Sequence, residues 1–330
     1  MDVVETSKAS IRDRGLKVAL PEGEDERILQ AAQRLSGAGL ARPVIMGRPA
    51  EVQARAAALG VQLEGCAVRD PASDGALATY AAHIASGRDK MTAGMAQRML
   101  RRPLYFAGAM VAAGDAAAMV AGVANPTRRV IEAGLLTIGL APGITTPSSF
   151  FLMLVPNAPA GDRRAYIFAD CAINAEPSAQ ELADIAITSA ASAKSLLLCE
   201  PRVALLSFST HGSASHRRVD KVRAALEIAR RLRPDLAIDG ELQGDAAVSA
   251  VVAAKKVPGG SPVAGRANVL VFPDLDSGNI AYKLVQHLGA ATAIGPFLQG
   301  FAKPICDLSR GASVDDVVAT VAVALARSLR

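Results

Sequence analysis

The densest run of chemically useful side chains is the segment KPICDLSRGASVDD at 303–316. Ser309 and Arg310 stand directly before Gly311, which allows the backbone to turn sharply. The apolar periodicity of 314–329 predicts a helix after this turn. A helix N-terminus favours an anion, and an arginine fork can hold a phosphate through two parallel hydrogen bonds. The segment therefore predicts a phosphate-binding turn at 309–311.

The same segment also fits a purely structural interpretation. Ser313 is a good N-cap residue, and Asp315 and Asp316 would complement the helix macrodipole in the first turn. Asp307 could likewise do no more than cap a turn. The residue types alone leave both interpretations open.

The elements that must position this turn follow an alternating pattern along the chain. Short apolar runs predict strands at 17–20, 43–46, 119–123, 150–155, 166–168, 203–208 and 269–272, and helical spacing predicts helices at 25–40, 179–198, 217–232 and 279–288. This alternation predicts an α/β fold whose parallel or mixed sheets are covered on both faces. A chain of 330 residues favours two packed domains, with candidate breaks at Pro142–Pro147 and Gly295–Pro296.

Composition argues against several classes of function. The formal net charge is +5, the basic residues are scattered, and only 4 Tyr, 8 Phe and no Trp are available for base stacking, so we expect no nucleic-acid partner. No stretch is long and apolar enough to predict a membrane anchor, and the N-terminus has no apolar h-region typical of secretion. The four cysteines show no zinc spacing and indicate reduced thiols, hence a cytoplasmic protein.

Several familiar catalytic motifs are absent from the sequence. It contains no G-x-G-x-x-G, no G-x-x-x-x-G-K-[ST], no G-x-S-x-G and no H-E-x-x-H. His211 and His216 flank a Gly/Ser loop, and we interpret them as solvated loop residues instead of metal ligands. We therefore expect no metal site.

Seven collinear blocks from about Val18 to the C-terminus resemble phosphate acetyltransferases of the phosphate acetyl/butyryltransferase family. They are VALPEGEDERILQAAQRL (18–35), PLYFAGAMV (103–111), FADCAIN (168–174), LSFSTHGSA (206–214), DGELQGDAA (239–247), NVLVFPDLDSGNIAYKLVQHLG (268–289) and IGPFLQGFAKPICDLSRG (294–311). The resemblance implies two α/β domains facing a cleft, in an isocitrate/isopropylmalate dehydrogenase-like architecture. Domain I would comprise 1–142 plus 297–330, and domain II 143–296, with dimerisation through domain II giving a homodimer.

The resemblance also implies the reaction. An acetyl group would pass reversibly between acetyl phosphate and coenzyme A by direct thiolate attack in a ternary complex, giving acetyl-CoA and phosphate. Ser309 and Arg310 would bind the acyl phosphate, and Asp316 would be the base that accepts the thiol proton. Coenzyme A would be a substrate, with no tightly bound cofactor and no metal.

This sequence departs from the family pattern at two positions where an arginine is usual. The first carries Glu132 and the second carries His287, so two expected cationic contacts to anionic substrate are replaced. The cysteine that often follows the Ser-Arg-Gly turn is Ala312 here, which indicates that it is not a required nucleophile.

Other basic residues could supply the missing charge. Arg128 lies one helical turn before Glu132 and Arg129 three residues before it, while Arg88 could match a further family arginine across an alignment gap. The residues expected to bind substrate are Arg128, Arg129, His287, Arg88 and Gly311.

Three alternative functions stay open at this point. A phosphate butyryltransferase would keep the chemistry and admit a longer acyl chain. A non-catalytic acetyl-CoA-sensing domain, as in malic enzymes, is favoured by Glu132 and His287 and disfavoured by the retained turn and Asp316. An isocitrate-dehydrogenase-like oxidoreductase would need metal-binding aspartates and a nicotinamide site that the sequence does not display.

Overall fold

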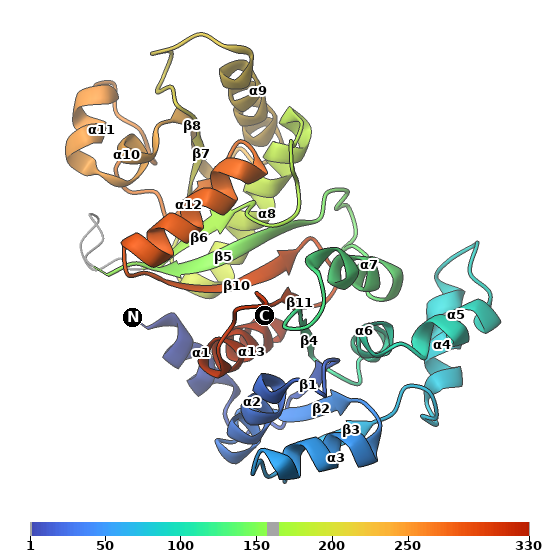
Figure 1. Ribbon diagram of the computed structural model, residues 1–330. Coiled ribbons are helices and arrows are strands. Elements are labelled where there is room, and N and C mark those ends of the chain that lie inside the picture. Colours follow the sequence, from blue (N-terminus) through green and yellow to red (C-terminus); the bar gives the residue numbers. More distant parts are fainter. Residues whose placement is uncertain (1, 157–164, 330) are drawn as a thin grey trace. The chain divides into compact units, whose positions relative to one another are not determined.

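The chain forms two compact units in a computed structural model that describes residues 2–156 and 165–329 (Figure 1). Unit 1 is built from Met1–Gly143 and Phe301–Arg330, and unit 2 from Ile144–Gly300. The chain thus leaves unit 1 beside Pro142 and re-enters it after Gly300. Gly295–Pro296 lies inside a strand of unit 2, at a register shift between Ile294 and Phe297.

Unit 1 is an α/β layer structure. Its elements, in chain order, are α1 (Val3–Ile11), β1 (Lys17–Leu20), α2 (Glu26–Gly37), β2 (Arg42–Met46), α3 (Pro49–Ala58), β3 (Ala67–Arg69), α4 (Leu77–Ser86), α5 (Ala93–Leu100), α6 (Pro103–Ala113), β4 (Ala118–Ala121), α7 (Thr127–Thr137), β11 (Ile305–Asp307) and α13 (Val314–Ser328).

The strands of unit 1 pair in the order β3-β2-β1-β4-β11, and each neighbouring pair is parallel. The chain builds outward from β1 to β2 and β3, then crosses to the other side of β1 for β4. In open parallel sheets, ligands bind outside the carboxyl ends of the strands at such a switch point. The loops after β1 and β4 are therefore where a site is expected.

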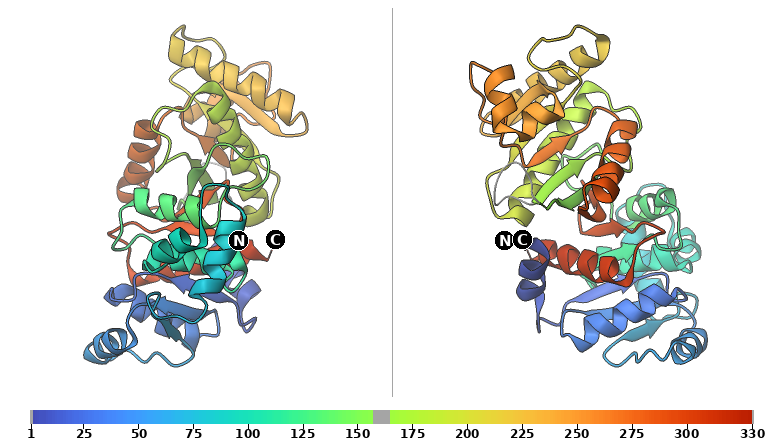
Figure 2. Two further views of the ribbon diagram at one scale, coloured as in Figure 1. Left: turned by 90° about the vertical axis from the view of Figure 1, so that its right-hand side faces the viewer. Right: turned by 60° about the vertical axis from the view of Figure 1, so that its left-hand side comes forward.

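Helices cover both faces of this sheet. Figure 1 shows α13 and α6 on the two sides of strand β4, and each packs against it. Helix α6 has a fully buried run from Leu104 to Val111, which suits a helix enclosed by β1, β4, α4, α5 and α7. Helix α1 packs along α13, so both ends of the chain lie in unit 1 (Figure 2).

Unit 2 contains the remaining elements. In chain order they are β5 (Ser148–Leu154), β6 (Ala165–Ala169), α8 (Ala179–Leu197), β7 (Arg202–Leu206), α9 (Arg217–Leu232), β8 (Ala237–Leu242), α10 (Gly244–Val248), α11 (Ala250–Lys256), β9 (Val269–Val271), α12 (Leu275–Leu288) and β10 (Thr292–Gln299).

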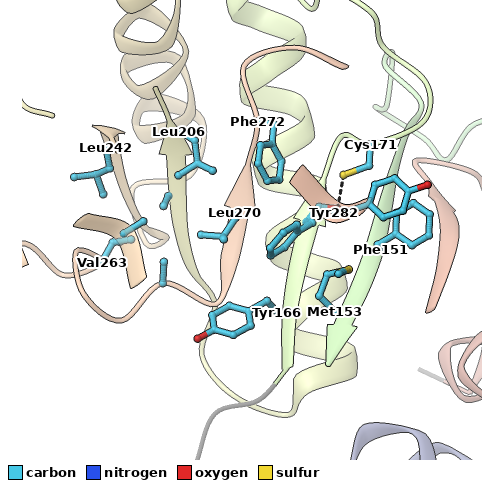
Figure 3. Packing of buried hydrophobic residues seen from close by; sticks show 14 of the residues in the cluster. Phe151, Met153, Tyr166, Cys171, Leu206, Leu242, Val263, Leu270, Phe272 and Tyr282 are labelled. Carbon is cyan, nitrogen blue, oxygen red and sulfur yellow. Dashed lines mark hydrogen bonds between the residues drawn. The ribbon is translucent and has the colours of Figure 1, made fainter. Parts of the chain in front are cut away.

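The strands of unit 2 pair in the order β10-β5-β6-β9-β7-β8, with the first two pairs antiparallel and the rest parallel. Helix α8 packs on β6, β7 and β9, and α12 packs on β5, β6 and β10. Figure 3 shows part of the core of unit 2, where the rings of Phe151 and Tyr282 stack with centroids 4.0 Å apart. Fully burying such a side chain contributes about 1.5–3 kcal/mol.

The predicted α/β class is confirmed by the helix-covered strands, which pair in parallel in unit 1 and in mixed directions in unit 2. Each of the seven predicted strands overlaps an observed one, and each predicted helix overlaps an observed helix. In the ranges the structure describes, no helix combines the length and the apolar character needed to cross a membrane.

Candidate active site

The Ser309-Arg310-Gly311 turn lies at the carboxyl ends of parallel strands in unit 1. Strand β11 runs parallel to β4 and ends at Asp307, and the N–H of Leu308 donates to the carbonyl of Ala121 at 2.5 Å. The turn then leads into helix α13 at Val314. The fold thus brings the predicted phosphate-binding turn to the edge of the sheet where ligands bind in such folds.

The turn is held by short-range hydrogen bonds and is open to solvent. The N–H of Gly311 donates to Ser309 Oγ at 3.2 Å, and the N–H of Ala312 donates to the Ser309 carbonyl at 2.9 Å. Ser309, Arg310 and Gly311 are all exposed. The φ of Gly311 lies outside the left-handed region, and a Cβ there would meet only Ser309 Oγ, at 3.8 Å. The turn itself therefore does not require glycine at this position.

The start of helix α13 is capped by side chains of its own first turn. Ser313 Oγ accepts from the N–H of Asp316 at 3.2 Å, and Asp316 Oδ2 accepts from the Ser313 N–H and hydroxyl at 2.9 and 2.8 Å. The predicted N-cap role of Ser313 is confirmed. Among the described residues no hydrogen bond reaches Asp316 Oδ1, so one carboxylate oxygen caps the helix and the other can take a further partner.

Glu22 organises the neighbouring loop after β4. This carboxylate is buried and accepts hydrogen bonds from the four backbone N–H groups of residues 122–125, at 2.9–3.0 Å, and from Asn125 Nδ2 at 2.8 Å. A carboxylate with this many donors is fixed in place. Glu22 therefore joins the end of β1 to the loop that leads into α7.

Asp307 lies under the turn, at the end of β11. It is 2 % exposed, and its Oδ2 accepts from Thr127 Oγ1 at 2.6 Å, whereas Oδ1 has no hydrogen-bond partner in the described part of the chain. A Cβ on Gly122 would come against Asp307 Oδ1 and within 2.5 Å of the Leu308 backbone, so only glycine fits at this close approach. Burial raises the pKa of Asp307 to about 7.

A cavity of about 370 Å³ opens in unit 1 beside these loops. It lies at the switch point, between the loops after β1, β2 and β4 and the start of α6. Arg102, Tyr105, Asn125 and Arg129 are among its lining residues. Two guanidiniums therefore border the cavity.

The predicted arginines of α7 lie on its first turn. Arg128 and Arg129 are exposed, the helix N-cap is Pro126, and no side chain caps the N-terminus. Burial raises the pKa of Tyr105, and Glu132, on the same helix, adds to this shift. The Arg102 guanidinium carbon lies 4.4 Å from the centroid of the Tyr105 ring. The N-terminus of α7 is thus positively charged.

The other two predicted substrate-binding residues lie elsewhere. Arg88 donates to the Ile84 carbonyl at 3.2 Å and to the carbonyls of Leu135 and Thr137, at 3.1 and 3.4 Å, near the end of α7. His287 is exposed on the last turn of α12, in unit 2. Arg88 is therefore already hydrogen-bonded to backbone carbonyls near the end of α7, while His287 is exposed to solvent.

Two residues of this region were not predicted from the sequence, Glu22 and Arg27. Both belong to the segment PEGEDER at 21–27, which follows strand β1 directly. Four carboxylates and an arginine directly after a buried parallel strand are the signal that could have identified them. The described ranges contain no group of three or more His, Cys, Asp or Glu that could hold a metal ion.

Comparison with known proteins decides the family. The family model described as phosphate acetyl/butaryl transferase matches residues 2–325. The chain belongs to this family. A phosphate acetyltransferase from Clostridium acetobutylicum is 45% identical over 332 residues, covering 100% of this chain and 99% of the relative. The phosphate acetyl/butaryl transferase family was expected from the seven sequence blocks, and that prediction is confirmed.

Solved structures confirm the fold expected of the phosphate acetyl/butaryl transferase family. A phosphotransacetylase from Streptococcus pyogenes superposes with a TM-score of 0.91 at 42% identity, over 99% of this chain and 98% of that one. A 4-hydroxythreonine-4-phosphate dehydrogenase from Klebsiella pneumoniae has a TM-score of 0.55 at 13% identity, over 94% and 99% of the two chains. The second likeness concerns the fold alone and agrees with the predicted dehydrogenase-like architecture.

Proposed function

We propose that this protein is a phosphate acetyltransferase, which forms acetyl-CoA and phosphate from acetyl phosphate and coenzyme A in a reversible reaction. The observation that carries the proposal is the exposed Ser309-Arg310-Gly311 turn at the carboxyl ends of parallel strands, in a chain matched almost throughout by the family. Anions are bound at such positions by backbone N–H groups and by guanidinium groups.

The chemistry requires a thiolate and a good leaving group. The coenzyme A thiol, with a pKa near 8.5 like that of a free cysteine, gives its proton to Asp316. The sulfur then attacks the acetyl carbonyl, the carbon–sulfur bond forms, and the bond from carbon to the phosphate oxygen breaks. Arg310 neutralises the departing phosphate, and Ser309 donates a hydrogen bond to an oxygen on which charge develops.

The open space at Gly311 supports this assignment. Because the turn does not need glycine for its own backbone conformation, the missing side chain leaves room for a substrate to approach the peptide groups. The Oδ1 atom of Asp316 is the oxygen that would accept the thiol proton, since Oδ2 is held by Ser313. The cap and the base can therefore be the same side chain.

Four basic residues are proposed to bind the anionic substrates. Arg128 and Arg129 combine two guanidiniums with an uncapped helix N-terminus, an arrangement that favours phosphate groups. Arg88 would have to leave the carbonyls near the end of α7 to reach a substrate, and His287 would contribute a cation only when protonated.

We propose no tightly bound cofactor, with coenzyme A and acetyl-CoA acting as substrates, and no nucleic-acid partner. The four cysteines are free thiols, which supports a cytoplasmic location. The proposed domains are 1–142 plus 297–330 and 143–296, and the division of the chain into two compact units supports this assignment.

We also propose a homodimer formed through unit 2. Helix α12 exposes Ile280, Leu284 and Leu288 at a spacing of one helical turn, with exposed fractions of 55%, 51% and 82%. An apolar stripe of this kind on one helix is typical of a surface that a second copy covers. Because the same stripe would meet itself across a two-fold axis, one helix can supply both halves of the interface.

The function is tested by following thioester absorbance with coenzyme A and either acetyl or butyryl phosphate. A phosphate acetyltransferase shows turnover with acetyl phosphate and a lower kcat/KM with butyryl phosphate. A reversed preference would make the chain a butyryltransferase. Tight acetyl-CoA binding without turnover of either substrate would instead identify a sensor.

A further inference from the structure

Arg27 links the Ser309-Arg310-Gly311 turn to helix α2, the helix that follows β1. It lies on the first turn of α2, and its Nη1 donates to the carbonyls of Arg310 and Ala312 at 2.6 and 3.1 Å. These two carbonyls stand on either side of Gly311. A side chain distant in the sequence therefore holds the turn by hydrogen bonds to its backbone carbonyls.

The remaining donors of Arg27 are also used. Its Nε and Nη2 donate to the two oxygens of Asp25 at 2.9 and 2.8 Å, and Nη2 also donates to the carbonyl of Val123 at 3.0 Å. A guanidinium has five N–H donors, and each has a partner here. Arg27 thus joins three segments at the carboxyl ends of β1, β4 and β11.

This arrangement leaves Arg27 no capacity to bind phosphate itself. Asp25 balances its charge in a two-bond ion pair, and the two side chains are only 24% and 16% exposed. The exposed cation of the turn is Arg310, whose side chain is free to face substrate. Gly311 makes the turn conformationally permissive, so an external tie is needed to keep Ser309 and Arg310 in one arrangement.

We propose that Arg27 is a positioning residue for the transfer reaction, which holds the Ser309-Arg310-Gly311 backbone in the arrangement that presents the Arg310 guanidinium to the acyl phosphate. The proposal rests on the proposed function. Lysine cannot replace arginine in this role, because an ammonium group has three donors and no planar fork. Nothing in the five contacts requires Arg27 to touch a substrate.

The test compares Arg27→Lys with Arg34→Gln. Arg34 is on the same helix and also reaches the start of α13, through a 2.6 Å contact with Asp315, but both side chains are exposed and neither contacts the turn. We expect Arg27→Lys to lower kcat about 10- to 100-fold, because small misplacements of reacting groups have effects of this size, with KM for acetyl phosphate changed less than about 3-fold. Arg34→Gln should keep wild-type kinetics.

A double-mutant cycle with Arg310→Gln separates positioning from general stabilisation. This substitution leaves the carbonyl of residue 310 in place and removes the side chain that Arg27 is proposed to position. In the Arg310→Gln background, Arg27→Lys should therefore lower kcat by less than about 3-fold further. If the two losses multiply, or if Arg27→Lys alone keeps wild-type kcat, Arg27 does not act through Arg310 and the proposal is wrong.

Asp25→Asn provides a second variant in case Arg27→Lys does not fold. An asparagine can still accept the N–H of residue 27 as the N-cap, but it no longer holds the guanidinium as an ion pair. A loss of kcat by several-fold with an unchanged melting temperature supports positioning, and unchanged kcat contradicts it. A wild-type protein without acetyl transfer would overturn the proposed function instead, whatever the variants do.

Discussion

At the scale of single residues, the site depends on carboxylates held in different ways. Glu22 accepts five hydrogen bonds, Asp316 caps a helix with one oxygen, and Asp307 is buried with a single hydroxyl partner. Only Asp316 is both half-exposed and directly downstream of the turn. This difference in surroundings makes Asp316 the residue of the three that can exchange a proton with a substrate.

The first prediction separates the base from the cap. Asp316→Asn should abolish most turnover, because an amide cannot accept the thiol proton, whereas Asp315→Asn should change it little. If both residues only complement the helix macrodipole, each substitution should cost about 0.3–1 kcal/mol of stability and neither should stop the reaction. Initial rates and thermal melts of the two variants decide between these outcomes.

The second prediction concerns the raised pKa of Asp307. The folded protein holds this proton up to about pH 7, whereas an unfolded aspartate releases it near 3.8. The contribution of Asp307 to the free energy of unfolding is therefore fully present below about pH 4. It falls as pH rises toward 7, by at most about 1.4 kcal/mol per pH unit. Asp307→Asn lacks this dependence and should gain stability relative to wild type between pH 4 and 8.

Urea unfolding at several pH values checks this result. Parallel curves of unfolding free energy against pH for the wild type and Asp307→Asn over that range would show that the Asp307 carboxyl does not titrate in the folded protein.

The sequence identified Asp307 only as a candidate turn residue, since its burial depends on Gly122 and Thr127, which are distant along the chain.

At the scale of elements, the sequence pattern identified short apolar strands and missed β8, which buries two charged side chains. Strand β8 contains Asp239 and Glu241, which are 4% and 2% exposed, and two carboxylates inside a strand do not match any apolar pattern. Glu241 is accommodated because Arg223 of α9 donates to it at 2.9 Å, with Ser209 Oγ at 2.8 Å. These partners become visible only once the chain is folded.

The third prediction uses this ion pair. Burial acts to raise the pKa of Glu241, but hydrogen bonds from Arg223 and the Gly212 N–H hold it at about 2. Its stabilising contribution is therefore present above about pH 4.5 and is lost as pH falls toward 2. Arg223→Gln should therefore lower the free energy of unfolding at pH 7, and lower it less at pH 3, where Glu241 contributes less.

Urea unfolding of both proteins at the two pH values provides the measurement. If Arg223→Gln lowers the free energy of unfolding equally at pH 7 and pH 3, the ion pair does not depend on the ionisation of Glu241.

Helix boundaries, by contrast, were predicted well where capping is local, as at Ser313 of α13, because an N-cap needs only residues of the same turn.

At the scale of the whole molecule, membership of the family followed from seven sequence blocks, whereas the arrangement of the site did not. Ser309 and Arg310 were proposed from residue types and spacing, and the resemblance added their roles and Asp316 as the base. The structure adds the support from Arg27, Glu22 and Asp307. These contacts join segments about 100 to 285 residues apart. Periodicity and local motifs contain no information about such pairs.

The fourth prediction tests the proposed homodimer. Leu284→Glu places a charge in the middle of the apolar stripe of α12 and should convert a dimer into a monomer, as measured by light scattering. Val251→Glu is the control, because Val251 is also an exposed apolar residue, at 69%, and lies on α11 instead. A monomeric wild type, or a Leu284→Glu variant that stays dimeric, would contradict the assignment of this helix.

The most direct test of the account is the rate of thioester formation from acetyl phosphate and coenzyme A by the wild type and Arg310→Gln. Glutamine keeps a neutral donor and removes the charge that stabilises the departing phosphate. We predict ready turnover by the wild type and a kcat lower by about 100-fold or more in the variant, with unchanged thermal stability. A folded Arg310→Gln protein that retains more than about half of the wild-type kcat would show that the Ser309-Arg310-Gly311 turn is not the acyl phosphate site.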